Sequence, residues 1–134
     1  MKYSEFKAAQ SAAISAFPIA WAFSQSQLAE AMEKLGVKDQ SELAQTYGGG
    51  LIRKTDAQSL RDLHARQSVE RSEFLADPAN LKSALVYELS NHEYCITYDH
   101  SSALSALGLR SSELSSDQWD ILKDAKTKYL EGCE

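Results

Sequence analysis

Cysteine, proline and glycine are all scarce in this chain of 134 residues, which contains 2 Cys, 2 Pro and 6 Gly. The two cysteines, Cys95 and Cys133, are too few for a disulfide framework and form no C-x-x-C pair for zinc or redox chemistry. The sequence therefore predicts two reduced thiols in a cytoplasmic protein. With so little proline and glycine, no long disordered tail is expected.

Long apolar runs and an excess of basic charge are missing too. The longest apolar stretch, residues 12–23, is interrupted by Ser15 and Pro18 and is shorter than the roughly 20 residues of a membrane-spanning helix. The first seven residues include Glu5 and lead into no secretory signal pattern. Because 14 Lys and Arg face 19 Asp and Glu, the net charge is −5, which argues against direct binding to a nucleic-acid backbone.

Helical periodicity is the strongest feature that is present. Apolar residues recur every three or four positions over residues 2–17, 28–35 and 81–89, as in amphipathic helices. Hydroxyl or carboxylate residues suited to cap helix starts precede four of the predicted helices, and Gly36 and Gly108 are suited to end two. The predicted starts are Ser24–Gln27, Thr55–Gln58, Asp77-Pro78 and Ser115–Gln118.

Three short segments are predicted as strands because they are apolar, aromatic or β-branched: residues 18–23, 51–53 and 94–98. Residues 41–45 are ambiguous and would suit one or two helical turns. The sequence thus predicts an α+β fold, predominantly helical with two or three short strands, in a single compact domain spanning residues 1–134. Burial in the strand over 94–98 would raise the pKa of Cys95 and make it inert.

Three glycines in a row, Gly48–Gly50, invite comparison with a phosphate-binding loop. Such a loop runs directly into a helix N-terminus, whereas Leu51 and Ile52 follow here. A tight turn or close backbone packing is therefore the favoured interpretation. No G-x-S-x-G nucleophile motif occurs in the chain.

Polar residues are densest at Asn91-His92-Glu93 and at Asp99-His100. If the segment between them were an extended strand, His92 and Asp99 would lie roughly 23 Å apart, too far to share a metal ion. The structural alternative is that Asn91 ends a helix in the left-handed conformation and His92 interacts with the negative helix end. We expect this cluster to serve folding first.

Aromatic residues gather in or beside the predicted strands. They either fill the core or form a stacking platform for a ligand, and the core is the favoured interpretation. Tyr94 and Tyr98 would present their hydroxyls on one face of a strand. The set consists of Trp21, Phe23, Tyr47, Tyr94 and Tyr98.

Three segments in a fixed order resemble a family of small uncharacterised proteins from bacteriophages and bacterial mobile elements. They are Phe17-Pro18-Ile19-Ala20-Trp21-Ala22-Phe23-Ser24, Gly48-Gly49-Gly50-Leu51-Ile52 and Glu88 to Tyr94 with Tyr98-Asp99. The resemblance covers residues 17–109 and implies a fold and an origin. It supplies no catalytic residue, because no activity is established for that family.

Two functional hypotheses follow. The favoured one is a non-catalytic accessory protein, without cofactor or metal, that binds a host or defence-system protein. Its acidity would suit a partner with a basic surface. The sequence leaves open whether the chain forms a symmetric homodimer. The alternative is a small ligand-binding protein or enzyme that uses the Asn91–Asp99 region. Its candidate ligand-binding residues are Trp21, Asn91, His92, Glu93, Tyr94, Tyr98 and Asp99.

Overall fold

The computed structural model describes residues 1–46 and 48–133, which divide into two compact units. The helical unit comprises Met1–Ala8 and Gln67–Glu134, and the sheet unit comprises Ala9–Arg66. Helices α1 (Tyr3–Ser15) and α3 (Ala57–Leu75) contribute residues to both. The predicted fold class, predominantly helical α+β with short strands, is confirmed. The single domain over residues 1–134 stays a prediction.

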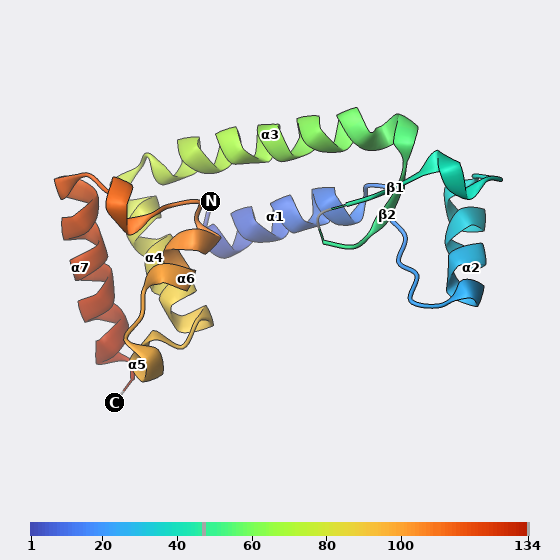
Figure 1. The fold of residues 1–134 in the computed structure, drawn as a ribbon. Helices are drawn as coiled ribbons and strands as arrows, with labels where there is room; N and C mark the ends of the chain where they lie inside the picture. Colours follow the sequence, from blue (N-terminus) through green and yellow to red (C-terminus); the bar gives the residue numbers. More distant parts are fainter. Residues whose placement is uncertain (47, 134) are drawn as a thin grey trace. The chain divides into compact units, whose positions relative to one another are not determined.

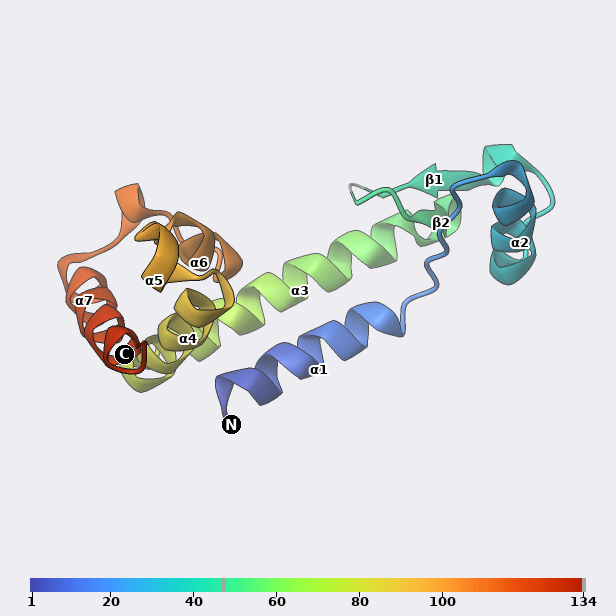
Figure 2. The ribbon, with the colours of Figure 1, turned by 90° about the horizontal axis from the view of Figure 1, so that it is seen from below.

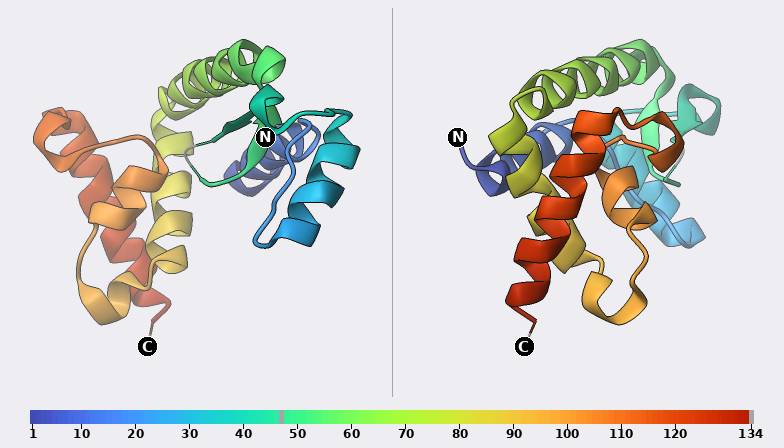
Figure 3. Two further views of the ribbon diagram at one scale, coloured as in Figure 1. Left: turned by 45° about the vertical axis from the view of Figure 1, so that its right-hand side comes forward. Right: turned by 90° about the vertical axis from the view of Figure 1, so that its left-hand side faces the viewer.

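Helix α4 (Pro78–Asn91) is the centre of the helical unit. It packs against α7 (Ser116–Glu131) and α6 (Ser101–Ala106), and Figures 1 and 3 show α7 running beside it. The short helix α5 (Tyr94–Thr97) follows α4, and the 3-10 turn η3 (Ser111–Glu113) leads into α7. Within the described part of the chain, no helix combines the length and apolarity needed to cross a membrane.

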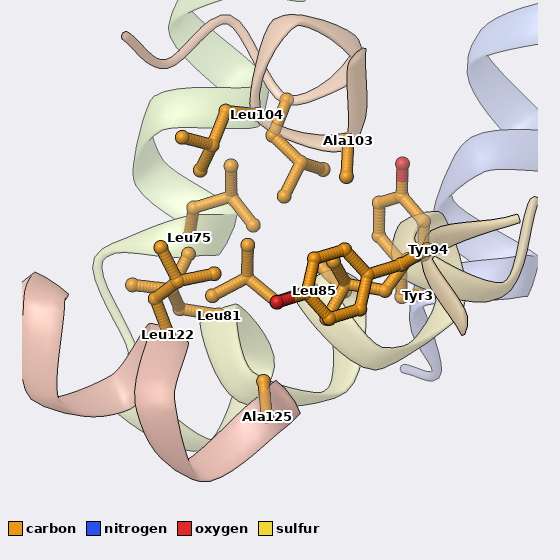
Figure 4. Packing of buried hydrophobic residues seen from close by; sticks show 12 residues of the cluster. Tyr3, Leu75, Leu81, Leu85, Tyr94, Ala103, Leu104, Leu122 and Ala125 are labelled. Carbon is orange, nitrogen blue, oxygen red and sulfur yellow. The ribbon is translucent and has the colours of Figure 1, made fainter. Parts of the chain in front are cut away.

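The core of the helical unit lies on the predicted apolar face of α4. Leu85 is 1% exposed and Leu89 is fully buried, as the four-residue spacing predicts. Leu122 from α7 and Leu104 from α6 point toward this face (Figure 4). The packing of α6 and α7 against this stripe of α4 therefore builds the largest apolar cluster among the described residues.

Most of the predicted helix ends are confirmed. The Asp77 carboxylate accepts from the backbone N–H of Ala79, and Pro78 occupies the first turn of α4. Ser115 and Gln118 form a reciprocal capping box at the start of α7. Gly36, with φ of 70°, ends helix α2 (Gln25–Leu35) in the left-handed region, as glycine does readily.

The sheet unit contains a two-stranded antiparallel sheet beside α2 (Figure 2). Strand β1 (Leu43–Gln45) follows the 3-10 turn η1 (Gln40–Glu42) and pairs with β2 (Leu51–Arg53). The strand predicted at 51–53 is confirmed, and the ambiguous segment 41–45 supplies both a turn and its partner strand. Gly49 has φ of 89°, so the glycine run makes a tight turn between strands.

The buried strand predicted over residues 18–23 is wrong. Only an isolated bridge forms there, between Ala20 and Leu51. Ala20 is buried, but Trp21 is 53% exposed and Phe23 is 84% exposed. The apolar composition of this segment, without clear periodicity, was therefore misread as a strand. It is a linking segment whose backbone pairs with the sheet at one residue, Ala20.

The strand predicted over residues 94–98 is also wrong, because Tyr94–Thr97 forms α5. The Tyr98 N–H donates to the Tyr94 carbonyl over 2.8 Å, a helical i to i+4 bond. The predicted left-handed helix end at Asn91 is incorrect as well. Asn91 is the last residue of α4, and the left-handed residue is Glu93, with φ of 54°.

The capping box predicted over Thr55–Gln58 does not form. The 3-10 turn η2 (Lys54–Asp56) precedes α3 instead, and it has no side-chain cap. Asp56 accepts from the Arg53 guanidinium over 2.7 Å, so the local charge pair anchors this turn. The helix itself begins at Ala57, close to the predicted position.

Candidate functional site

The predicted ligand-binding residues fall into both units. Trp21 belongs to the sheet unit, where its ring lies against the glycine turn: a Cβ atom on Gly50 would approach Trp21 Cζ2 to 3.3 Å. The other six belong to the helical unit, at the end of α4, in α5 and just after it. Of the five aromatic residues predicted to fill the core or bind a ligand, Tyr47 lies outside the described residues. Phe23 is exposed, so it does not fill the core.

A buried carboxylate, Glu88, organises the end of α4. Its side chain is fully buried, and its Oε1 accepts from the Tyr3 hydroxyl over 2.7 Å and from the Lys7 ammonium. Its Oε2 lies 3.4 Å from Asn91 Nδ2 and 3.3 Å from His92 Nε2. The structure thus brings Asn91 and His92 together at one anion, one turn below them on the same helix.

The electrostatics keep Glu88 ionised. Burial raises the pKa of its carboxyl group, but hydrogen bonds from Lys7 and Tyr3 outweigh burial and hold the pKa below its ordinary value. Burial and the hydrogen bond to Glu88 raise the pKa of Tyr3, so the phenol stays a donor. Because Glu88 has no solvent access, it cannot reach a substrate. Its anion instead fastens the first turns of α1 to α4.

Sequence reasoning missed Glu88, although a signal was present. Leu81, Ala84, Leu85 and Leu89 define the inner face of α4, and position 88 falls between them on that face. A glutamate there must be buried, and a buried carboxylate requires donors or a cation. The identity of those donors, 81 and 85 residues earlier in the chain, was not predictable from spacing.

Helix α5 is held between two non-glycine residues in the left-handed conformation, Glu93 with φ of 54° and Tyr98 with φ of 53°. This conformation costs roughly 1–2 kcal/mol for a residue with a Cβ atom. Tyr94 anchors the segment: it is 8% exposed and belongs to the core. Its ring lies edge-to-face with Tyr98 at 5.8 Å between centroids. The backbone here is therefore fixed in a strained geometry.

The same segment displays apolar side chains to solvent. Ile96 is 72% exposed and Tyr98 is 67% exposed, and the acidic residues Glu93 and Asp99 flank them. We call Glu93, Ile96, Tyr98 and Asp99 the α5 surface. Exposed apolar side chains in an acidic border are suited to contact another molecule.

The groups after α5 have local structural partners. The Asp99 carboxylate accepts from the backbone N–H of Ser101 over 2.9 Å, and this bond lowers the pKa of Asp99. His100 Nδ1 lies 2.8 Å from the Lys126 ammonium. Burial, followed by the charge of Lys126, lowers the pKa of His100. Asp99 thus stabilises the turn before α6.

The prediction that Cys95 is an inert thiol buried in a strand is wrong. Cys95 lies in α5 and is partly exposed, and its backbone N–H donates to the Tyr129 hydroxyl over 3.5 Å. A hydrogen bond with Tyr129 lowers the pKa of the Cys95 thiol, where burial in a strand was expected to raise it. The thiol is therefore more reactive than predicted.

Two pockets of the helical unit lie away from the polar cluster. One of about 290 Å³ is lined by α3 and the segment after α6, including Arg71 and Gly108. Another of about 290 Å³ lies between α4 and α7 and includes Lys82 and Asp124. Neither lining includes Asn91, His92 or Asp99. Within residues 1–46 and 48–133, no three His, Cys, Asp or Glu side chains are grouped to hold a metal ion.

Comparison with known proteins gives a family but no activity. The model of a family of unknown function (DUF7659) matches residues 2–131. No curated protein and no solved structure matches the chain.

Proposed function

The chain belongs to the DUF7659 family, whose function is not established, and we propose that it is a non-catalytic accessory protein that binds a host or defence-system protein. We propose further that it derives from a bacteriophage or mobile element and acts in the cytoplasm, as the resemblance of its three segments implies. The α5 surface is the binding surface in this proposal.

The proposal rests on one observation: Ile96 and Tyr98 are exposed on a segment whose backbone is strained and anchored in the core. Both are largely exposed, yet the backbone that carries them is fixed by buried Tyr94 and by two left-handed residues. A surface that is already ordered loses little conformational entropy on binding. Burying each large apolar side chain would contribute about 1.5–3 kcal/mol.

Charge selects the kind of partner. Glu93 and Asp99 border the apolar side chains, and the whole chain carries a net charge of −5. A protein with an apolar depression bordered by Lys and Arg would complement both features, and the long-range attraction would speed encounter. Nucleic-acid-binding proteins of the host carry such basic surfaces.

The alternative, a ligand-binding or catalytic site over Asn91–Asp99, has less support. Asn91 and His92 turn toward Glu88, and the Asp99 carboxylate is engaged with Ser101. Such a site needs these groups to converge on one concave surface, and the two pockets described above are lined by other residues.

The test is affinity capture from a bacterial lysate followed by calorimetry with the purified captured protein. The double variant Ile96→Glu, Tyr98→Glu should bind at least tenfold more weakly than the wild type, because two apolar contacts are replaced by charge. Val69→Glu is the matched control, since Val69 is 57% exposed on α3. Equal affinity of the double variant and the control would refute the proposal, as would capture of nothing by the wild type.

A further inference from the structure

Both cysteines of the chain lie beside one tyrosine. Cys95 is the second residue of α5, and Cys133 follows Gly132, directly beyond the end of α7. The Cys95 N–H donates to the Tyr129 hydroxyl over 3.5 Å, and Cys133 Sγ lies 3.6 Å from the Tyr129 carbonyl oxygen. The two thiols also interact with each other and with the phenol. Two segments distant in sequence thus place both cysteines beside Tyr129.

The two thiols are not equivalent. The hydrogen bond with Tyr129, and then that with Cys133, lowers the pKa of Cys95. The Tyr129 phenol also lowers the pKa of Cys133, but partial desolvation and the neighbouring Cys95 outweigh it, and the net pKa is raised. At neutral pH Cys95 therefore has the larger thiolate fraction, and the thiolate is the nucleophile in disulfide exchange.

Both cysteines are accessible to a small-molecule disulfide. Cys133 is exposed and Cys95 is partly exposed, and both are free thiols. A disulfide requires the two Cα atoms to lie about 4.4–6.8 Å apart. Cys133 lies outside α7 and follows a glycine, so its backbone can adjust without breaking the helix.

We propose that Cys95 and Cys133 form a redox modification site that reacts with small-molecule disulfides and closes into an intramolecular disulfide. In the first step the Cys95 thiolate attacks one sulfur of the small disulfide, forms a mixed disulfide and releases one small thiolate. In the second step Cys133, deprotonated, attacks the Cys95 sulfur and releases the other small thiolate. The balance is one small disulfide and two protein thiols giving one protein disulfide and two small thiols.

The closed site would join α5 to the end of α7. A reducing cytoplasm would reverse it, as expected of redox-responsive rather than structural disulfides. This inference is independent of the proposed protein partner, because it concerns only the chemistry of the two thiols.

The test uses the full reduced chain incubated with oxidised glutathione at pH 7.5, quenched with an alkylating agent and analysed by intact mass. The wild type should lose two hydrogens, remain monomeric and carry neither glutathione nor the alkylating group. Cys133→Ser should accumulate the mixed disulfide on Cys95. Cys95→Ser should react several-fold more slowly than Cys133→Ser, because its remaining thiol is less ionised.

Tyr129→Phe separates a chemical role from a merely structural one. It keeps the ring and removes the hydroxyl, so the first step should slow several-fold at pH 7.5, and the difference from the wild type should shrink as rising pH ionises the thiols. Wild-type protein that ends with glutathione on both thiols, or that forms disulfide-linked dimers, would overturn the proposal. Equal rates for the two serine variants would overturn the assignment of Cys95 as the attacking thiol.

Discussion

Replacing Glu88 with Gln tests the assignment of this side chain as a buried anion. The substitution keeps the shape and removes the charge. Hydrogen bonds to a charged group contribute about 1.5–3 kcal/mol each, and Tyr3 and Lys7 both donate to Oε1. The amide can still accept there, but its NH₂ group would replace the acceptor that faces Asn91 and His92. We expect the free energy of unfolding to fall by about 2–4 kcal/mol at pH 7.

Urea unfolding followed by tryptophan fluorescence measures this loss. The chain has two tryptophans, Trp21 in the sheet unit and Trp119 in the helical unit, where Trp119 packs against the core. In a Trp21→Phe background the signal reports on the unit that contains Glu88. Glu73→Gln makes the same chemical change at an exposed position of α3 and should leave the midpoint unchanged within about 0.5 kcal/mol.

The pH dependence gives a second, independent check. The folded pKa of Glu88 is below its ordinary value of 4.5, so the carboxylate contributes its full stabilisation above pH 4.5. That contribution is lost as pH falls below 4.5 and through the folded pKa. The difference between wild type and Glu88→Gln should therefore shrink in acid. An unchanged free energy at pH 7, or a difference that grows in acid, would refute the buried ion pair.

Two further predictions concern the helices themselves. Leu85→Ala should lower the free energy of unfolding by about 2–5 kcal/mol, because Leu85 is 1% exposed and a cavity would remain. An unchanged melting temperature would contradict its place in the core. Ser115→Ala should cost about 1 kcal/mol by removing the cap of α7, and Ser112→Ala in η3 is the exposed control. Equal urea midpoints for these two variants would show that the capping box contributes nothing.

The helices were largely predictable because their signals are local. The caps at Asp77 and Ser115 and the four-residue spacing of the leucines in α4 depend only on near neighbours. The segment 94–98 misled for a physical reason. Tyr94 and Tyr98 share a face in a helix, where residues are four apart, and also in a strand, where they are an even number apart. A short aromatic run cannot distinguish the two.

The candidate site was predicted only in part. Asn91 and His92 were singled out by their polarity, and they do meet at one point. The group they meet, Glu88, and its partners Tyr3 and Lys7 depend on long-range packing that no local pattern encodes. The same holds for Cys95, whose backbone N–H donates to the Tyr129 hydroxyl 34 residues later. The exposure of Ile96 depends on the helical form of α5, and the sequence predicted a strand there instead.

The pairing of Tyr3 with Glu88 across 85 residues has a consequence for biosynthesis. Translation at about 5–20 residues per second would separate the appearance of these two side chains by about 4–17 s. During that interval the whole sheet unit is synthesised, and the first turns of α1 have no Glu88 carboxylate to which they can donate. Nascent chains halted before residue 88 should therefore leave this opening segment accessible to proteases, while longer ones protect it.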